Sequence, residues 1–160
     1  MSKTTPKFVD FDNARYEDQA AVMAQSEAAG VCPFCAENLG KFHQSPIEWE
    51  GEHWVVTKNG WPYTNTRVHL LAILKVHQES IDQLSDAAAA ELFTALKWAV
   101  AKYEIPGGGL VVRFGDSNYS AGSVLHLHAH IIQPDITAPN YADNPVKVKI
   151  GKYKKTPQTT

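Results

Sequence analysis

Three histidines at alternate positions in an apolar segment restrict the fold of this chain more than any other feature. Residues 126–132 read His-Leu-His-Ala-His-Ile-Ile. Successive side chains of a β-strand point to opposite faces of a sheet. The pattern therefore predicts a strand over 124–132 with His126, His128 and His130 on one face. The alternative without a functional role is that the histidines are three half-exposed polar residues on an amphipathic strand.

The size and charge of the chain exclude several classes of protein. Its 160 residues suffice for one domain with a real core, so we expect a single domain over 1–160 with flexible tails at 1–10 and 151–160. A formal charge of -2 gives no sign of a nucleic-acid partner. Neither a run of 18 apolar residues nor the apolar stretch of a signal peptide is present, so we expect no membrane association and a cytoplasmic location.

Local patterns predict an α+β fold. Residues 14–29 favour a helix that ends at Gly30, and the apolar spacing of 81–103 predicts a long helix with a possible cap at Ser85-Asp86. The segments that we expect to form strands are 53–58, 69–76, 110–114, 124–132 and 146–150. Together they predict an antiparallel sheet of about five strands with one long helix packed across it.

The last of these segments alternates valine or isoleucine with lysine, which is typical of a protected edge strand. Lysines in this part of the chain could instead contact phosphate groups or form a solvated tail. They are Lys147, Lys149, Lys152, Lys154 and Lys155.

The pair Cys32 and Cys35 has Cys-x-x-Cys spacing and admits three interpretations: a zinc half-site, a thioredoxin-like redox pair, or two unrelated cysteines. A redox pair of that kind should follow a strand and open a helix. Here a helix precedes the pair, and residues 36–40 look like a turn. These features favour a metal site over a redox module.

Zinc prefers four tetrahedral nitrogen and sulfur ligands, so two thiolates leave two positions to fill. His77 ends a predicted strand and His126 begins the histidine strand, so both could lie near the cysteine pair. Such a Cys2His2 site would be structural because it leaves no open position for water.

If His126 binds zinc, the other two histidines are free to act on a substrate. A neutral imidazole whose Nδ1-H is held by a backbone carbonyl presents a fixed Nε2 lone pair, which suits His128 for attack on phosphorus. His130 could stabilise phosphate oxygens or protonate the leaving group. The polar loop 115–123 offers hydroxyls and glycine amides to a phosphate.

The segment 121–132 resembles the histidine triad signature, in which three histidines alternate with apolar residues. Trp61-Pro62-Tyr63, the strand 69–73 and Lys75-Val76-His77 resemble the first half of the same superfamily. The Trp-Pro-Tyr segment leans toward its galactose-1-phosphate uridylyltransferase and dinucleoside-polyphosphate phosphorylase branches. The resemblance covers roughly residues 30–135 and implies the family's fold, with a zinc knuckle after the N-terminal helix, and a homodimer.

The resemblance also implies roles for particular residues. His128 would be the nucleophile, with His130 and Ser123 at the phosphate and His69 supporting the triad. Asn59 falls near the family's ribose-binding position. The implied zinc set is Cys32, Cys35, His77 and His126.

Two positions depart from the family pattern. Leu74 stands where a proline is usual, and Gly122 stands where many hydrolases have glutamine, so the alternative phosphate contacts are Ser123, Ser120 and Asn118. We therefore expect a nucleotide hydrolase or nucleotidyltransferase acting on a nucleotide or dinucleoside polyphosphate. It would cleave a phosphoanhydride or phosphoramidate next to a nucleoside monophosphate through a covalent histidine intermediate. The alternatives are a nucleotide-binding protein with vestigial catalysis and a Cys-x-x-Cys redox module.

Overall fold

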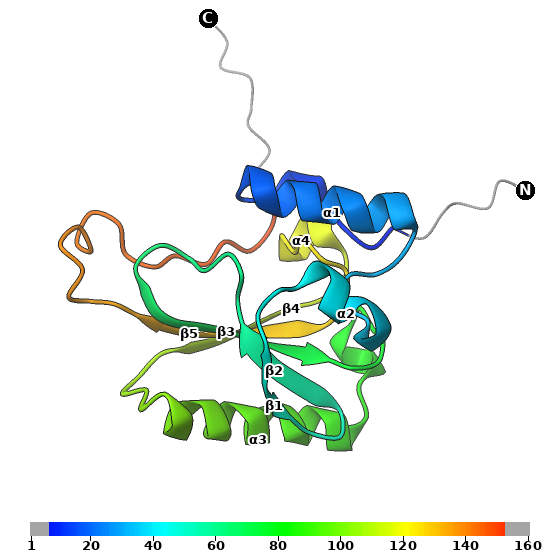
Figure 1. The fold of residues 1–160 in the computed structure, drawn as a ribbon. Helices are drawn as coiled ribbons and strands as arrows, with labels where there is room; N and C mark the ends of the chain where they lie inside the picture. The colour runs from blue at the N-terminus through cyan, green and yellow to red at the C-terminus, as the bar shows by residue number, and fades with distance from the viewer. Residues whose placement is uncertain (1–6, 153–160) are drawn as a thin grey trace, which may run out of the picture.

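The computed structural model describes residues 7–152 and has one antiparallel β-sheet at its centre (Figure 1). Its five strands lie in the order β1-β2-β3-β5-β4, and all neighbours are antiparallel. This confirms the predicted α+β class and sheet. The strands are β1 (Ile47–Glu50), β2 (Trp54–Lys58), β3 (Thr66–Leu74), β4 (Gly109–Arg113) and β5 (His128–Pro134).

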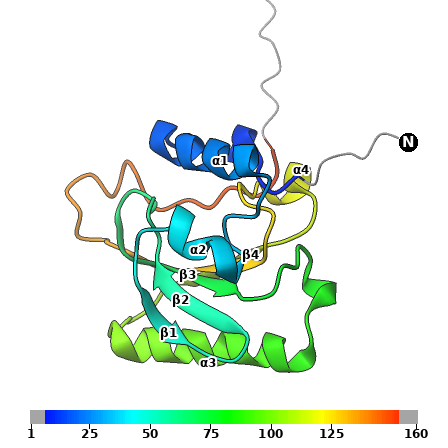
Figure 2. The ribbon, with the colours of Figure 1, turned by 45° about the vertical axis from the view of Figure 1, so that its right-hand side comes forward.

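Helices cover both faces of the sheet. The long helix α3 (Asp86–Lys102) lies along one face, and the other face carries the remaining α-helices, as Figures 1 and 2 show. These are α1 (Glu17–Ala29), α2 (Ala36–Phe42) and α4 (Ser117–Ser120), with 3-10 turns at Phe11–Asn13 and Ile81–Gln83. None of the helices in residues 7–152 is both long and apolar enough to cross a membrane.

The larger core lies between α3 and the sheet. Trp54 is fully buried there, and its indole Nε1-H donates to the Ala88 carbonyl at 2.7 Å. The Ser85 hydroxyl accepts from the Ala88 amide, which fixes the start of α3 at Asp86. Helix α3 is therefore shorter than the helix predicted over 81–103. Residues 81–83 form a separate 3-10 turn, and α3 begins only after the Ser85 cap.

The opposite face of the sheet is the one that carries the histidines. His130 on β5 pairs with Leu71 on β3, and His128 pairs with Ile73. On the other side of β5, His128 pairs with Arg113 at the end of β4. Paired residues of antiparallel strands project to the same face, so this register places a guanidinium beside the central histidine.

The histidine strand begins later than the sequence predicts. β5 starts at His128, because the Leu127 amide donates to the Gln78 carbonyl and the Leu127 carbonyl accepts from the Leu74 amide. His126 therefore lies in the bend before the strand. Only His128 and His130 belong to the strand, so the predicted start of the strand at residue 124 is wrong.

Three other expectations differ from the structure. The segment 146–150 forms no strand; its Lys149 carbonyl accepts from the Arg113 guanidinium at 2.8 Å, outside any backbone ladder. The expected turn at 36–40 lies in helix α2, which is held by burial of Leu39 and by a hydrogen bond from the Asn38 side-chain nitrogen to the Cys32 carbonyl. Strand β1 is short, lies at the edge of the sheet, and was not predicted.

The described parts of the two expected tails are packed against the rest of the molecule. Val9 is buried and forms a bridge with Val124. Asp10 is 2% exposed, and its carboxylate accepts hydrogen bonds from the Ser117 hydroxyl and from Lys152 Nζ at 2.7 Å. These contacts hold residues 9, 10 and 152 against the rest of the described chain. Residues 1–6 and 153–160, including Lys154 and Lys155, lie outside the described part of the chain.

The Asp10 carboxylate thus joins the N-terminal segment, α4 and the C-terminal segment. Burial alone would raise its pKa, but the hydrogen bonds from Lys152 and Ser117 bring that pKa below its usual value. A carboxyl group with a lowered pKa stabilises the fold above its unfolded pKa, and this contribution is lost as the pH falls through the lowered value.

We expect Asp10→Asn to lower the free energy of unfolding at pH 7 by about 1–3 kcal/mol, because charge-assisted hydrogen bonds are weakened. Urea denaturation measures this, and the difference from wild type should shrink as the pH falls below 3.8, the ordinary pKa of the group. The matched control is Asp12→Asn, because Asp12 also contacts Lys152 but is exposed. Equal losses in the two variants would contradict the structural role of Asp10.

Candidate active site

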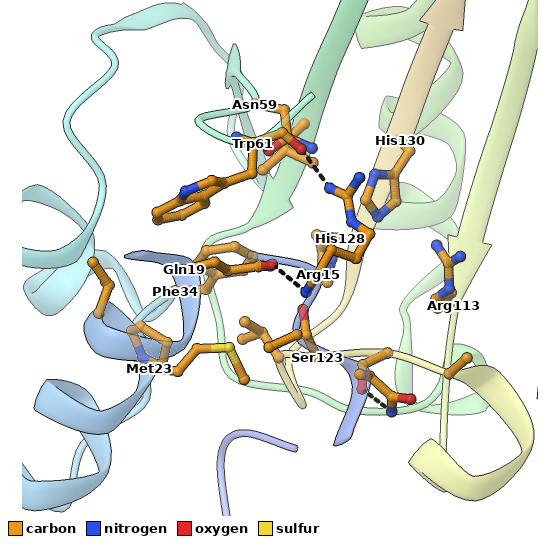
Figure 3. Close-up of a pocket in the computed structure, with 18 of the residues that line it drawn as sticks. Arg15, Gln19, Met23, Phe34, Asn59, Trp61, Arg113, Ser123, His128 and His130 are labelled. Atoms are coloured by element: carbon orange, nitrogen blue, oxygen red, sulfur yellow. Dashed lines mark hydrogen bonds between the residues drawn. The ribbon is translucent and has the colours of Figure 1, made fainter. Parts of the chain in front are cut away.

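A pocket with an empty volume of about 1120 Å³, partly open to solvent, lies against the histidine face of the sheet. Strand β5 supplies its floor, and the N-terminal segment with α1 supplies one wall. Figure 3 shows Trp61, Phe34 and Met23 on one side and Arg113 on the other, with Arg15, His128 and His130 between them. The pocket is therefore apolar at one end and basic at the other.

His128 lies in the floor of this pocket with its tautomer fixed. Its Nδ1 is 2.7 Å from the His126 carbonyl oxygen, which can only accept, so Nδ1 carries the proton and Nε2 has a lone pair. Burial lowers the pKa of His128 to about 4, although the bond to the His126 carbonyl opposes this shift. The ring is therefore neutral near pH 7, as a nucleophile must be.

A chain of hydrogen bonds fixes His130 in the tautomer opposite to that of His128, with the proton on Nε2. The Tyr63 amide donates to His69 Nδ1 at 3.0 Å, so the proton of His69 is on Nε2. The Asn59 side-chain nitrogen, 3.1 Å from this Nε2, is then a second donor beside it and not its partner. His69 Nε2 lies 2.9 Å from His130 Nδ1, which must accept. The His130 Nε2 therefore carries a proton. Burial lowers the pKa of both rings, that of His69 to about 4, so a neutral donor ring lies beside the neutral lone-pair ring of His128.

Asn59 and Ser123 also line the pocket. The Asn59 side-chain oxygen accepts from the Trp61 amide at 2.9 Å and thereby holds the turn after β2. The Ser123 carbonyl accepts from the Asp10 amide at 2.8 Å, which holds the N-terminal segment beside the pocket. Both residues are thus near the histidines.

Asn118 and Ser120 do not line this pocket. Asn118 faces a separate hollow, and its carbonyl accepts from the Lys152 amide at 2.8 Å. The Ser120 hydroxyl is buried and accepts from the Gly122 amide at 3.2 Å. The reason is the helical turn α4, which the sequence analysis treated as an open polar loop. We no longer assign either residue to the phosphate.

The basic residues of the pocket, Arg15 and Arg113, were not predicted from the sequence. Arg113 could have been found, because a charged side chain that ends an apolar strand next to the histidine strand is unusual. Arg15 carried no local signal, since only the folded N-terminal segment brings it to Tyr63 and Trp61.

Tyr63 connects these groups. Its ring is stacked on His130 with centroids 5.9 Å apart, and the Arg15 guanidinium lies 4.3 Å from its centroid. Its hydroxyl accepts from Arg113 Nη1 at 3.1 Å. One aromatic side chain thus fixes both guanidinium groups relative to the histidines.

Apolar side chains gather at the other end of the pocket. Phe34 packs edge-on against His128 with centroids 5.0 Å apart. The buried His43 donates or accepts a 2.8 Å bond with the Thr57 hydroxyl at the same end. Other side chains that line this end are Val22, Met23, Phe42, Trp61 and Leu71. A flat aromatic ring would be buried here between apolar groups.

The cysteine pair and two histidines form a second cluster behind the pocket. One donor atom from each of Cys32, Cys35, His77 and His126 lies within 4.8 Å of all the others. His126 Nε2 is 2.6 Å from the Leu74 carbonyl, so Nε2 carries the proton and Nδ1 presents its lone pair to the cysteines. His77 Nε2 lies 3.3 Å from the Glu79 carboxylate, which likewise favours a free Nδ1.

The separations of these atoms fit a tetrahedral metal ion. The two Nδ1 atoms are 3.2 Å apart. The Sγ–Nδ1 distances are 3.4 Å for Cys32 to His126, 3.6 Å for Cys35 to His77 and 3.9 Å for Cys35 to His126. Ligands at usual zinc distances would be about 3.3 Å apart for two nitrogens and about 3.6 Å for nitrogen and sulfur. Burial raises the pKa of Cys32 to about 12, so a cation is needed to keep this thiol ionised at neutral pH.

The surroundings of the cysteines also bear on the redox interpretation. Helix α2 follows Cys35 directly, as in a redox pair, but helix α1 rather than a strand precedes Cys32. The pKa of each thiol is raised by burial, whereas reactive redox cysteines have lowered pKa values. These features fit a metal-binding site better than a redox pair.

Comparisons with known proteins find no matching family model and no matching curated protein. Solved structures do match. A HIT family hydrolase from Clostridium thermocellum is 27% identical, with a TM-score of 0.51, and the match covers 68% of this chain and 94% of that one. A hypothetical histidine triad nucleotide-binding protein from Sulfolobus tokodaii is also 27% identical, with a TM-score of 0.50 and coverage of 64% and 68%.

A zinc-bound histidine triad family protein from Mycobacterium smegmatis is similar in fold, with 20% identity, a TM-score of 0.51 and coverage of 68% and 77%. The structural neighbours of this chain are histidine triad proteins, and the chain has the histidine triad fold.

Proposed function

We propose that this protein is a nucleotide hydrolase or nucleotidyltransferase that works through a covalent intermediate on His128. The observation that carries the proposal is the fixed tautomer pair, in which the His128 Nε2 lone pair lies beside the His130 Nε2-H donor. His128 Nε2 would form a bond to the phosphorus of a nucleoside monophosphate group. The bond to the leaving group breaks, and its electron pair goes to the leaving atom.

A second nucleophile would then release the nucleotide. Water, inorganic phosphate or a sugar phosphate attacks phosphorus, and the electron pair of the N–P bond returns to His128. The neutral His130 donor stabilises phosphate oxygens in both steps. The acceptor decides between hydrolase, phosphorylase and transferase, and the Trp61-Pro62-Tyr63 segment favours the phosphorylase and uridylyltransferase branches.

The shape of the pocket supports a nucleotide as the substrate. Its apolar end, with Trp61 and Phe34, suits a base, and Asn59 lies between this end and the histidines, where a ribose would be. Ser123 lines the phosphate end. Two 27% identical structural neighbours are described as a hydrolase and as a nucleotide-binding protein, which agrees with this proposal.

A nucleotide-binding protein with weak catalysis is the second candidate, and Gly122 is the observation in its favour. This position has no side chain to offer to a phosphate, and its amide bonds to the Ser120 hydroxyl. Arg15 and Arg113 supply cationic donors in the same pocket, which favours catalysis over this alternative.

We also propose that Cys32, Cys35, His77 and His126 hold one zinc ion, because their separations and free lone pairs fit it. Four protein ligands leave no open position, so zinc would stabilise the fold without entering the reaction. The residues would fix the cysteine segment and α2 against the end of the histidine strand.

We expect metal analysis of the purified protein to find one zinc per chain, and Cys32→Ser or Cys35→Ser to lose it with a lower melting temperature. His43→Asn is the matched control, because His43 is a buried histidine outside the cluster and should leave the zinc content unchanged. A zinc-free protein that loses two mass units in air would instead support a redox module.

We expect His128→Gly to abolish turnover of a dinucleoside polyphosphate, because no other lone pair faces the phosphorus. Nucleotide binding, measured by calorimetry, and zinc content should survive. Intact mass of wild-type protein quenched during turnover should show an added nucleoside monophosphate group that the variant lacks. Undiminished turnover by well-folded His128→Gly would rule out the covalent mechanism.

A further inference from the structure

Two arginines face the proposed catalytic histidines, and neither has an acidic partner in the described part of the chain. Among residues 7–152, no carboxylate forms an ion pair with Arg15 or Arg113. Asp12 is the one acidic residue that lines the pocket in this part of the chain; it is mostly exposed and pairs with Lys152. The basic end of the pocket is thus unneutralised in a chain whose net charge is negative.

Arg113 is held by neutral groups alone. Its guanidinium donates to the Ser120 carbonyl at 3.0 Å, to the Tyr63 hydroxyl at 3.1 Å and to the Lys149 carbonyl at 2.8 Å. These bonds orient the group without reducing its charge. The β4–β5 register places it on the same face as His128.

Arg15 comes from the N-terminal segment on the other side of Tyr63. Its guanidinium lies over the Tyr63 ring and donates to the Trp61 carbonyl, and its backbone amide donates to Gln19 Oε1 at 2.9 Å. The charge again faces only neutral partners. Figure 3 shows Arg15 in front of His128 and His130 and on the pocket side of both.

This arrangement provides more positive charge than one phosphate diester group requires. Arg15 and Arg113 lie at the end of the pocket with the histidines, and Lys149 also lines the pocket. We propose that Arg15 and Arg113 bind the phosphate of the leaving group, so that this site cleaves phosphoanhydrides in preference to phosphoramidates. The inference rests on the proposed function and names its substrate class.

The chemistry of the two bonds explains the preference. When His128 attacks a phosphoanhydride, the P–O bond breaks and its electron pair remains on an oxygen of the departing phosphate. That oxygen gains negative charge as the bond breaks, and two fixed guanidinium groups stabilise it. In a phosphoramidate the departing nitrogen needs a proton instead. Guanidinium groups, which stay protonated, cannot supply one.

The test compares two substrates that share the same nucleotide. Diadenosine tetraphosphate and adenosine 5′-phosphoramidate form one pair, and the corresponding uridine compounds form the second. We expect wild-type kcat/KM to be at least about tenfold higher for the anhydride. We expect Arg15→Gln and Arg113→Gln each to lower kcat/KM for the anhydride by about 10- to 100-fold, the value of a charge-assisted hydrogen bond. The phosphoramidate should lose less than about threefold.

Arg67→Gln is the matched control. Arg67 also lies on the sheet but bonds to Gln133 and the Tyr103 carbonyl outside the pocket, so both substrates should be turned over as by wild type. Arg15→Lys and Arg113→Lys, which keep the charge, should recover part of the anhydride activity. If Arg113→Gln fails to fold because it releases Lys149 and Ser120, the Arg15 variants decide the question.

Equal losses on both substrates would overturn the inference, because the arginines would then bind the nucleotide that the substrates share. A wild-type preference for phosphoramidates would also overturn it. Failure of the proposed function would look different: no substrate would leave a nucleotide on His128 in the intact mass of wild-type protein. The two failures are therefore distinguishable.

Discussion

The antiparallel pairing of β3 with β5 is the constraint on which the rest of this structure depends. It places Leu71 opposite His130 and Ile73 opposite His128. A shift of one residue would turn both histidines toward the apolar core under α3, and Ala129 and Ile131 toward the pocket. The burial of Leu70, Ala129 and Ile131 on the α3 side prevents this shift. Hydrophobic packing on one face of the sheet thus sets the chemistry on the other.

The sequence predicted those parts of the molecule that are encoded by local periodicity or fixed spacing. The alternation of histidines with apolar residues predicted the strand β5 with His128 and His130 on one face. The Cys-x-x-Cys spacing predicted the cluster with His77 and His126. Prediction was wrong where tertiary bonds override local preference. Val146–Ile150 alternates like a strand, but its carbonyl at Lys149 is bound by a side chain, so it never joins the ladder.

The basic half of the site could not be predicted for a related reason. Arg15 precedes α1 in a segment without periodicity, and its place beside Tyr63 depends on the buried Asp10 and on the paired Val9. Long-range contacts of this kind leave no pattern in the segment itself. The apolar end of the pocket was equally hidden, because Phe34 and Met23 look like ordinary core residues in the sequence. The fold was therefore more predictable than the lining of its pocket.

His126 contacts both functional centres through different atoms. Its ring belongs to the cysteine cluster, whereas its backbone carbonyl accepts the proton of the His128 ring. Every amino acid has that carbonyl, so the acceptor itself is independent of the residue type at position 126. Its direction, however, depends on how the ring anchors the bend. The cysteine–histidine cluster and the His128 ring are therefore connected through a single peptide unit, and a change in the position of His126 would change the orientation of the His128 ring.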